Sequence, residues 1–338
     1  MKILYAIQGT GNGHLSRAAD IIPELRKHGS LDLFVSGAQA EVNLPFPVKF
    51  KSKGLSFYFG KGGGIDFYKT FQRNSSRAVM KEINEFPVAQ YDLIVNDFEP
   101  ISAWAAKKKK IPCFGLGHQA AFLSAKSPRP KIIDPFGEWL LTHYAPLKKY
   151  VGFHFDRYDK HIFTPVIRSA IRTMEPENRG HYTVYLPAYD DKKLVALLLR
   201  LPARNWHIFS KHAKNKYQVE GISVWPVSGR AFVESMMGSE GVITGAGFET
   251  PAEVLHLNKK LLVVPMKHQY EQHCNATALK KLGVPVLKKM KSGNLKKVQR
   301  WIDEATPLDI SFPDTTAEAV ERLMRRASKT GKGQILSA

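Results

Sequence analysis

The stretch that decides the fold is Val242-Ile243-Thr244-Gly245-Ala246-Gly247-Phe248-Glu249-Thr250-Pro251-Ala252-Glu253. It has the pattern of a buried strand, a turn with two glycines and the start of a helix. Gly245 and Gly247 leave room for a pyrophosphate, to which the amides and the Thr250 hydroxyl at the helix start can donate hydrogen bonds. Glu253 follows one helical turn later, where its carboxylate can accept hydrogen bonds from a ribose diol. The stretch therefore predicts a diphosphate site at a helix N-terminus.

Strand-like runs alternate with helix-like segments on both sides of this stretch. The expected strands cover residues 2–8, 32–36, 92–96, 112–117, 182–186, 206–209, 241–244, 261–264 and 284–287. The expected helices cover residues 16–28, 67–86, 102–109, 192–200, 232–237, 251–257 and 269–282. Because such alternation gives parallel sheets covered by helices, the predicted fold class is α/β.

The length of the chain, 338 residues, suits two domains that each bury an apolar core. The alternation of strands and helices is interrupted where proline, glycine and charged residues gather between the two halves. We therefore predict a first domain at 1–163, a linker at 164–180, a second domain at 181–314, and a C-terminal helix and tail at 315–338.

The composition narrows the functional classes. A formal charge of +20 attracts polyanions such as nucleic acid, anionic lipid or a phosphorylated substrate. Cys113 and Cys274 lack the spacing of metal ligands, so neither zinc nor a disulfide is expected. There is no run of about 18 apolar residues, and Lys2 leads directly into a strand-like run without a signal peptide. We expect a cytoplasmic protein that does not span the membrane.

A second glycine turn, Gly9-Thr10-Gly11-Asn12-Gly13-His14, follows the first expected strand and precedes a helix that Ser16 can cap. Its backbone amides can approach a phosphate or a sugar. A dinucleotide site would need an acidic residue where the sequence has Val35-Ser36-Gly37. A P-loop would need Lys-Ser or Lys-Thr where it has His14-Leu15. Both of these alternatives are therefore disfavoured.

Polar side chains are expected together at one edge of the first sheet. His14 lies at the mouth of the glycine turn, where an imidazole of near-neutral pKa can take a proton from an acceptor hydroxyl. Asp97 follows the third expected strand and can orient this histidine and stabilise its charge. The structural alternative for Asp97 is to cap the next helix, a role that Ser102 can fill. His118 and Gln119 end the following strand and extend the polar cluster.

These motifs resemble those of the GT-B glycosyltransferases, in particular the lipid-linked N-acetylglucosaminyl transferase of peptidoglycan synthesis, the diacylglycerol galactosyltransferases and the plant and animal UDP-sugar transferases. In that family a G-x-x-[ST]-x-x-E element binds the donor diphosphate and ribose, and a [DE]-Q-x-x-N-A element contacts the donor sugar. The matching residues are Gly247, Thr250 and Glu253 for the first element, and Glu271, Gln272, Asn275 and Ala276 for the second. The segment Val224-Trp225-Pro226-Val227 is similar to the one that packs on the uracil and bonds it through backbone groups.

The resemblance extends to the first glycine turn. Gly11, Gly13 and His14 match the family's glycine loop, whose histidine is the base. Asp97 resembles the aspartate that supports this histidine. The resemblance therefore implies that His14 and Asp97 are catalytic.

Two further segments are similar to the peptidoglycan enzyme. Residues 111–119 resemble its P-x-x-x-H-E-Q-N region without the Glu-Asn part, which implies an acceptor-side role for His118 and Gln119. Residues 164–168 resemble its interdomain linker. One position departs from the family pattern, because Gly245 stands where related enzymes carry a histidine or an arginine for the diphosphate.

The resemblance implies a GT-B fold, with two Rossmann-like domains facing each other across a cleft. The acceptor would bind on the N-terminal side and the nucleotide sugar on the C-terminal side. The implied reaction is inverting transfer of a sugar from a UDP-sugar to a lipid or glycan hydroxyl, with no metal and no other cofactor. The alternatives are a UDP-sugar epimerase or hydrolase on the same fold, and a basic nucleic-acid-binding protein, which the charge alone suggests.

The expected partners are therefore a nucleotide-sugar donor, a lipid or glycan acceptor and an anionic membrane surface, and nucleic acid is not expected. The basic charge would seat the protein on the inner face of the membrane. Phe122, Trp139 and Tyr144 are the aromatic side chains expected to enter that interface.

Overall fold

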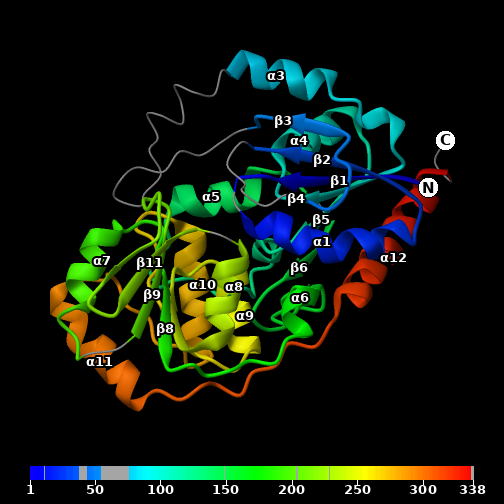
Figure 1. Ribbon diagram of the computed structural model, residues 1–338. Helices are drawn as coiled ribbons and strands as arrows, with labels where there is room; N and C mark the ends of the chain where they lie inside the picture. The colour runs from blue at the N-terminus through cyan, green and yellow to red at the C-terminus, as the bar shows by residue number, and fades with distance from the viewer. Residues whose placement is uncertain are drawn as a thin grey trace.

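A computed structural model describes residues 1–10, 12–37, 44–54, 76–147, 149–202, 205–227 and 229–335. Figure 1 shows two lobes, each built on a β-sheet with helices on its faces. The predicted α/β class is confirmed. Gly11 and residues 67–75 of the expected helix 67–86 lie outside the described residues.

The sheet of the first lobe has the strand order β3-β2-β1-β4-β5-β6-β7, and all neighbouring strands are parallel. The strands are β1 (Lys2–Gln8), β2 (Ser30–Ser36), β3 (Phe50–Ser52), β4 (Leu93–Asp97), β5 (Cys113–Gly117), β6 (Lys149–Phe153) and β7 (Ile162–Phe163). The residues of β1 from Ile3 to Ile7 are fully buried, because neighbouring strands and helices enclose this strand. A strand buried on both faces is a continuous apolar run, which is why its bounds could be predicted from the sequence.

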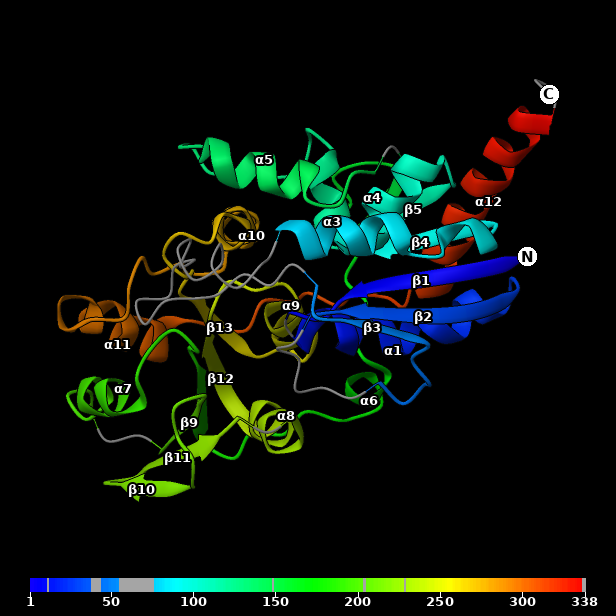
Figure 2. The same ribbon diagram turned by 90° about the horizontal axis from the view of Figure 1, so that it is seen from above.

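Helices cover both faces of this sheet. Ile3, Tyr5 and Ile7 of β1 share a core with α1 and α12, whereas Leu4 and Ala6 share a core with α3 and α4 on the opposite face. The helices of this lobe are α1 (Asn12–Arg26), α3 (Ser76–Glu85), η1 (Val88–Gln90), α4 (Pro100–Lys109), η2 (Gln119–Leu123), α5 (Pro135–His143) and α12 (Thr316–Ile335). The last helix, α12, comes from the C-terminal end of the chain and lies against α1, β5 and β6 (Figures 1 and 2).

The sheet of the second lobe has the strand order β10-β11-β9-β8-β12-β13, in which only the edge pair β10–β11 is antiparallel. Its strands are β8 (His181–Tyr185), β9 (Asn205–Ser210), β10 (Tyr217–Val219), β11 (Ile222–Pro226), β12 (Ser239–Thr244) and β13 (Lys260–Val263). Its helices are α7 (Asp191–Leu198), α8 (Gly229–Gly238), α9 (Glu249–His256), α10 (Tyr270–Lys281), η3 (Ser292–Asn294) and α11 (Leu295–Glu304), and the short α6 (Ser169–Arg172) lies between the two sheets in the sequence. The domain boundaries at 163 and 181 stay a prediction.

Three local expectations were wrong. The first helix begins at Asn12, so Ser16 lies inside it and does not cap it. The helix expected from Ser102 begins at Pro100 and is capped by Glu99, whose carboxylate accepts hydrogen bonds from two backbone amides of the first turn. The expected strand 284–287 forms only a bridge between Val263 and Val286.

Candidate active site

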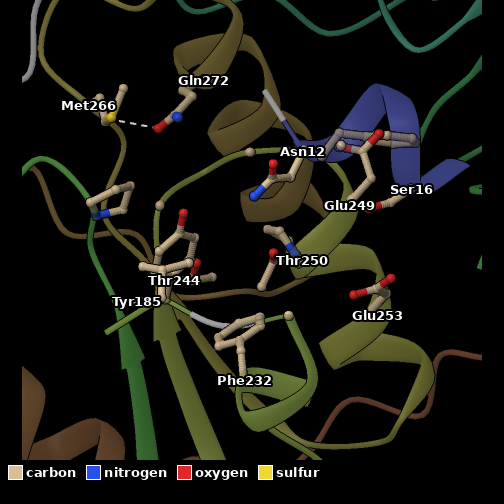
Figure 3. Close-up of a pocket in the computed structure, with 18 of the residues that line it drawn as sticks. Asn12, Ser16, Tyr185, Phe232, Thr244, Glu249, Thr250, Glu253, Met266 and Gln272 are labelled. Atoms are coloured by element: carbon tan, nitrogen blue, oxygen red, sulfur yellow. Dashed lines mark hydrogen bonds between the residues drawn. The ribbon is translucent and has the colours of Figure 1, made fainter. Parts of the chain in front are cut away.

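A cavity of about 640 Å³ lies between the lobes, where the loops after the strands of both sheets meet (Figure 3). The first lobe contributes the glycine turn around Gly13, and the second contributes the turn around Gly247. Of the predicted donor-binding residues, those that line the cavity are Gly13, Val227, Gly245, Gly247, Thr250, Glu253 and Gln272. The cavity is within the size range of small-molecule sites.

The N-terminus of α9 opens onto this cavity. Phe248 precedes the helix and provides no side-chain cap, so the amides of the first turn are not satisfied by it. A methyl group built on Gly247 would meet no atom within 4 Å, and one on Gly245 would come no closer than 3.4 Å to the Gln272 amide oxygen. The space that the sequence predicts beside these two glycines is therefore present.

The two glycine turns approach each other closely. A Cβ atom on Gly13 would lie 2.4 Å from an oxygen of Glu249, the first residue of α9. Because non-bonded atoms do not come that close, a side chain at position 13 would force the Glu249 carboxylate to move. Gly13 therefore leaves room for this carboxylate, in addition to any role toward a ligand.

His14 and Asp97 are paired as expected, with 3.0 Å between Nδ1 and Oδ1. His14 is in the first turn of α1 and Asp97 ends β4, so the pair lies where the carboxyl ends of two adjacent strands meet. Arg17, which the sequence analysis did not single out, donates to both oxygens of Asp97 at 2.9 and 2.7 Å. The same guanidinium donates to Glu249 across the cleft.

These contacts determine the protonation states of the pair. Burial lowers the pKa of His14, but Asp97 and Glu249 raise it, and the net pKa lies above the ordinary value. Burial raises the pKa of Asp97, but Arg17 and His14 lower it by more than burial raises it. The net pKa of Asp97 therefore lies below the ordinary value. Asp97 is therefore ionised at neutral pH and accepts a hydrogen bond from Nδ1–H of His14. Nε2 is then the nitrogen that can take a proton.

His118 and Gln119 contact the second lobe. His118 Nε2 lies 2.9 Å from the Asn275 amide oxygen, and its ring stacks on Phe248 at 3.8 Å between centroids. Gln119 donates to a Glu271 oxygen at 3.1 Å. These two pairs join the predicted acceptor-side residues to the predicted donor-sugar element. Burial lowers the pKa of His118, so its imidazole is neutral.

The other donor-binding candidates differ in their surroundings. Both Glu253 oxygens accept from Arg168 of the predicted linker, at 2.5 and 2.8 Å, and burial raises the Glu253 pKa in spite of this partner. Gln272 accepts a hydrogen bond from the Met266 amide at 2.9 Å (Figure 3). Trp225 does not line the cavity, and the ammonium of Lys216 lies 3.6 Å from the centre of its ring.

A family model describes most of the chain. The model of glycosyl transferase family 1 matches residues 1–305. The chain belongs to this family. A search of curated protein sequences finds no match.

Glycosyltransferases of solved structure share the fold of this family 1 member. MurG of Acinetobacter baumannii superposes with a TM-score of 0.56 at 15% identity, covering 96% of this chain and 99% of that chain. UGT89C1 of Arabidopsis thaliana, solved with UDP, superposes with a TM-score of 0.57 at 16% identity, covering 96% of this chain and 94% of that chain. SnogD of Streptomyces nogalater superposes with a TM-score of 0.51 at 17% identity, covering 100% of this chain and 99% of that chain. The predicted GT-B arrangement of two Rossmann-like domains is thereby confirmed.

Four charged residues around the cavity of this family 1 glycosyltransferase were not among the predicted site residues: Arg17, Arg168, Lys211 and Glu249. Arg17 follows His14 by three residues, a spacing that places both on one side of a helix and could have been noticed in the sequence. Arg168 and Lys211 are the cationic side chains among the described residues that line the cavity. No sequence signal distinguishes Lys211 from the many other lysines of this basic chain.

Two classes of feature are absent from the part of the chain that the structure describes. No group of three or more histidine, cysteine, aspartate or glutamate side chains there is arranged to hold a metal ion. No helix there is long and apolar enough to cross a membrane. The expectation for aromatic side chains at a membrane interface needs correction, because Phe122 and Tyr144 are buried in the core and only Trp139 is exposed.

Proposed function

We propose that this family 1 glycosyltransferase transfers a sugar from a UDP-sugar to a hydroxyl of a lipid or glycan acceptor, with inversion at the anomeric carbon. The observation that carries the proposal is the His14–Asp97 pair, which lies beside the glycine turn that faces the N-terminus of α9 across the cavity. A base on one side of the cleft and a phosphate-binding helix on the other are the two groups that a single displacement needs.

In the proposed reaction, Nε2 of His14 takes the proton of the acceptor hydroxyl. The acceptor oxygen forms a bond to the anomeric carbon while the bond from that carbon to the phosphate oxygen of UDP breaks. The electron pair of the broken bond leaves with UDP, whose charge is stabilised by the first-turn amides of α9 and by Thr250. Attack opposite the leaving group inverts the configuration.

The proposed donor site also needs cations, since Gly245 supplies no charge. Arg168 and Lys211 both line the cavity, and we assign the diphosphate to them. Glu253 can accept from the ribose with the lone pairs that Arg168 leaves free, because a carboxylate offers about four such sites. Val227, the residue after β11, is assigned to the uracil.

The acceptor side carries an exposed apolar surface, the α5 patch, formed by Ile132, Ile133, Phe136 and Trp139. Ile132 is 88% and Trp139 is 52% exposed. Figure 2 shows α5 at the outside of the first lobe, and α5 contacts η2, which carries Gln119. Apolar side chains on a chain of +20 charge suit an anionic lipid surface, so we propose that the patch seats the enzyme where a lipid acceptor is available.

The function is tested first by calorimetry with UDP in EDTA, where binding without metal is expected. The UDP-sugar is then incubated alone and with candidate lipid or glycan acceptors. Turnover only in the presence of an acceptor supports transfer, whereas conversion or hydrolysis of the donor alone would indicate an epimerase or a hydrolase. Binding of another nucleotide, with no heat from millimolar UDP, would contradict the donor assignment.

The α5 patch is tested by sedimentation with vesicles. The double substitution Phe136→Ser and Trp139→Ser should weaken binding to vesicles containing phosphatidylserine, because two aromatic side chains no longer enter the interface. The exposed Met80→Ser on α3 is the control for loss of apolar surface elsewhere. Equal binding of both variants and the parent enzyme would remove the patch from the membrane contact.

A further inference from the structure

Arg17 is a buried charge that the proposed reaction does not use. Its side chain is 1% exposed, in a helix that otherwise buries apolar residues against the sheet. A buried guanidinium is destabilising unless carboxylates pair with it. Arg17 has two such partners, Asp97 from the first lobe and Glu249 from the second.

The two partners of Arg17 belong to the two halves of the proposed site. Asp97 is the partner of His14, and Arg17 Nη2 lies 3.4 Å from the same His14 nitrogen that faces Asp97. Glu249 begins α9, lies against Gly13 and precedes Thr250. One guanidinium therefore connects the proposed base with the proposed diphosphate site.

We propose that Arg17 is a positioning residue for the transfer reaction, which holds Asp97 in place behind His14 and ties this pair to α9 through Glu249. The inference rests on the proposed function, in which His14 is the base. Arg17 touches neither the acceptor hydroxyl nor the donor, and acts through the two carboxylates.

This role has an electrostatic consequence for His14. The titratable groups of this network come from five elements or their ends: Arg17 on α1 itself, Asp97 on β4, Glu249 on α9, the neutral phenol of Tyr5 on β1 and the neutral imidazole of His118 after β5. Asp97 and Glu249 raise the pKa of His14, and Arg17 lowers it. Loss of the Arg17 charge should therefore protonate His14 at higher pH and remove the free base near neutrality.

The test measures the His14 pKa directly, by proton NMR of the imidazole, assigned from the signal that disappears in His14→Gln. In Arg17→Gln the pKa should rise by about one unit or more, the shift expected for a charge at this distance. Turnover at pH 7 should fall, by up to about tenfold for one pKa unit, and recover at higher pH. In Arg17→Lys the pKa should stay near that of the parent enzyme, because the charge is retained.

The control is Arg26→Gln, which removes the same charge from an exposed position at the end of α1. It should leave the His14 pKa unchanged. An unchanged His14 pKa in folded Arg17→Gln would overturn the proposal. If that variant does not fold, Glu249→Gln serves instead, because loss of the Glu249 charge should lower the His14 pKa. An unchanged His14 pKa would contradict the proposed connection between α9 and the His14–Asp97 pair.

The two proposals fail in different ways. If the NMR pKa moves in Arg17→Gln but the pH–rate profile does not follow it, His14 is not the base, whereas Arg17 still controls its protonation. If the rate profile of the parent enzyme follows the His14 pKa and Arg17→Gln changes neither, the base assignment stands and the role of Arg17 is wrong.

Discussion

The substitution Gly247→Ala separates ligand binding from folding at the proposed donor site. The added methyl group would meet no protein atom within 4 Å, and the backbone of Gly247 is not in the left-handed region. Alanine should therefore be accommodated without strain. Stability should stay the same or rise by about 0.4–1 kcal/mol, because alanine reduces the conformational freedom of the unfolded chain.

The effect of Gly247→Ala on the free energy of UDP binding should be larger than its effect on stability. The methyl group would occupy the space in which the diphosphate approaches the first-turn amides of α9, and would displace a phosphate oxygen from one such amide. Loss of one hydrogen bond to a charged group costs about 1.5–3 kcal/mol. The Kd for UDP should therefore rise by about 10- to 100-fold, since each 1.4 kcal/mol is a factor of about ten.

Calorimetry with UDP and thermal unfolding on the same preparation measure both effects. Gly293→Ala is the matched control, because its methyl group would also meet no atom within 4 Å and Gly293 lies in η3, outside the cavity. It should leave the Kd for UDP unchanged and affect stability in the same direction and range as Gly247→Ala. A Kd in Gly247→Ala equal to that of the parent enzyme would mean that the diphosphate does not lie against this turn.

Three further predictions follow from the charged pairs. Glu253→Ala should weaken UDP binding by about 1.5–3 kcal/mol in calorimetry, through loss of the ribose acceptor; an unchanged Kd in the folded variant removes Glu253 from the site. Arg168→Ala should lower the free energy of unfolding in urea more than Glu253→Ala. It leaves the Glu253 carboxylate, which is 3% exposed, without its partner, whereas the Arg168 side chain is 28% exposed and can reach water when Glu253 is lost. Equal losses in the two variants would contradict this prediction. The pKa of Asp97 is depressed, so its stabilising contribution is present above the ordinary value of about 3.9 and is lost as pH falls through the lower, folded-state value. The urea midpoint of Asp97→Asn should therefore fall less between pH 7 and pH 3 than that of the parent enzyme, and parallel pH dependences would argue against the shift.

Much of the fold could be predicted from the sequence because central parallel strands are unbroken apolar runs. β1 is such a strand from Ile3 to Ile7, and its bounds were expected. β12 has only Val242 and Ile243 as a short apolar pair, but the glycine turn after it marks its end, and it was expected within two residues of its bounds. Edge elements are less regular: β7 has two residues and β10 has three, too few to show a pattern. The return of α12 to the first lobe depends on contacts between residues far apart in the sequence, which periodicity does not reveal.

The geometry of the candidate site could be predicted where a motif fixes the backbone, and less so where side chains meet across the lobes. The glycine turns at Gly13 and Gly247 lie at the ends of strands, where their spacing indicated them. The partners of Asn275 and Glu271 are in the other lobe, at His118 and Gln119, so no local pattern could pair them. The ion pair between Arg168 and Glu253 likewise joins residues far apart in the sequence, so no local pattern could predict it.

The measurement that tests the central claim most directly is the pH dependence of transfer in the parent enzyme and in His14→Ala, with the UDP affinity measured on the same preparations. Because the pKa of His14 is raised, the rate of the parent enzyme should fall with decreasing pH through a value above the ordinary 6.5 or so. In His14→Ala this fall of the rate at low pH should be absent, and turnover should be about 10²- to 10⁴-fold lower, while the Kd for UDP stays unchanged. Turnover within a few-fold of the parent enzyme, with only the melting temperature altered, would contradict a catalytic His14.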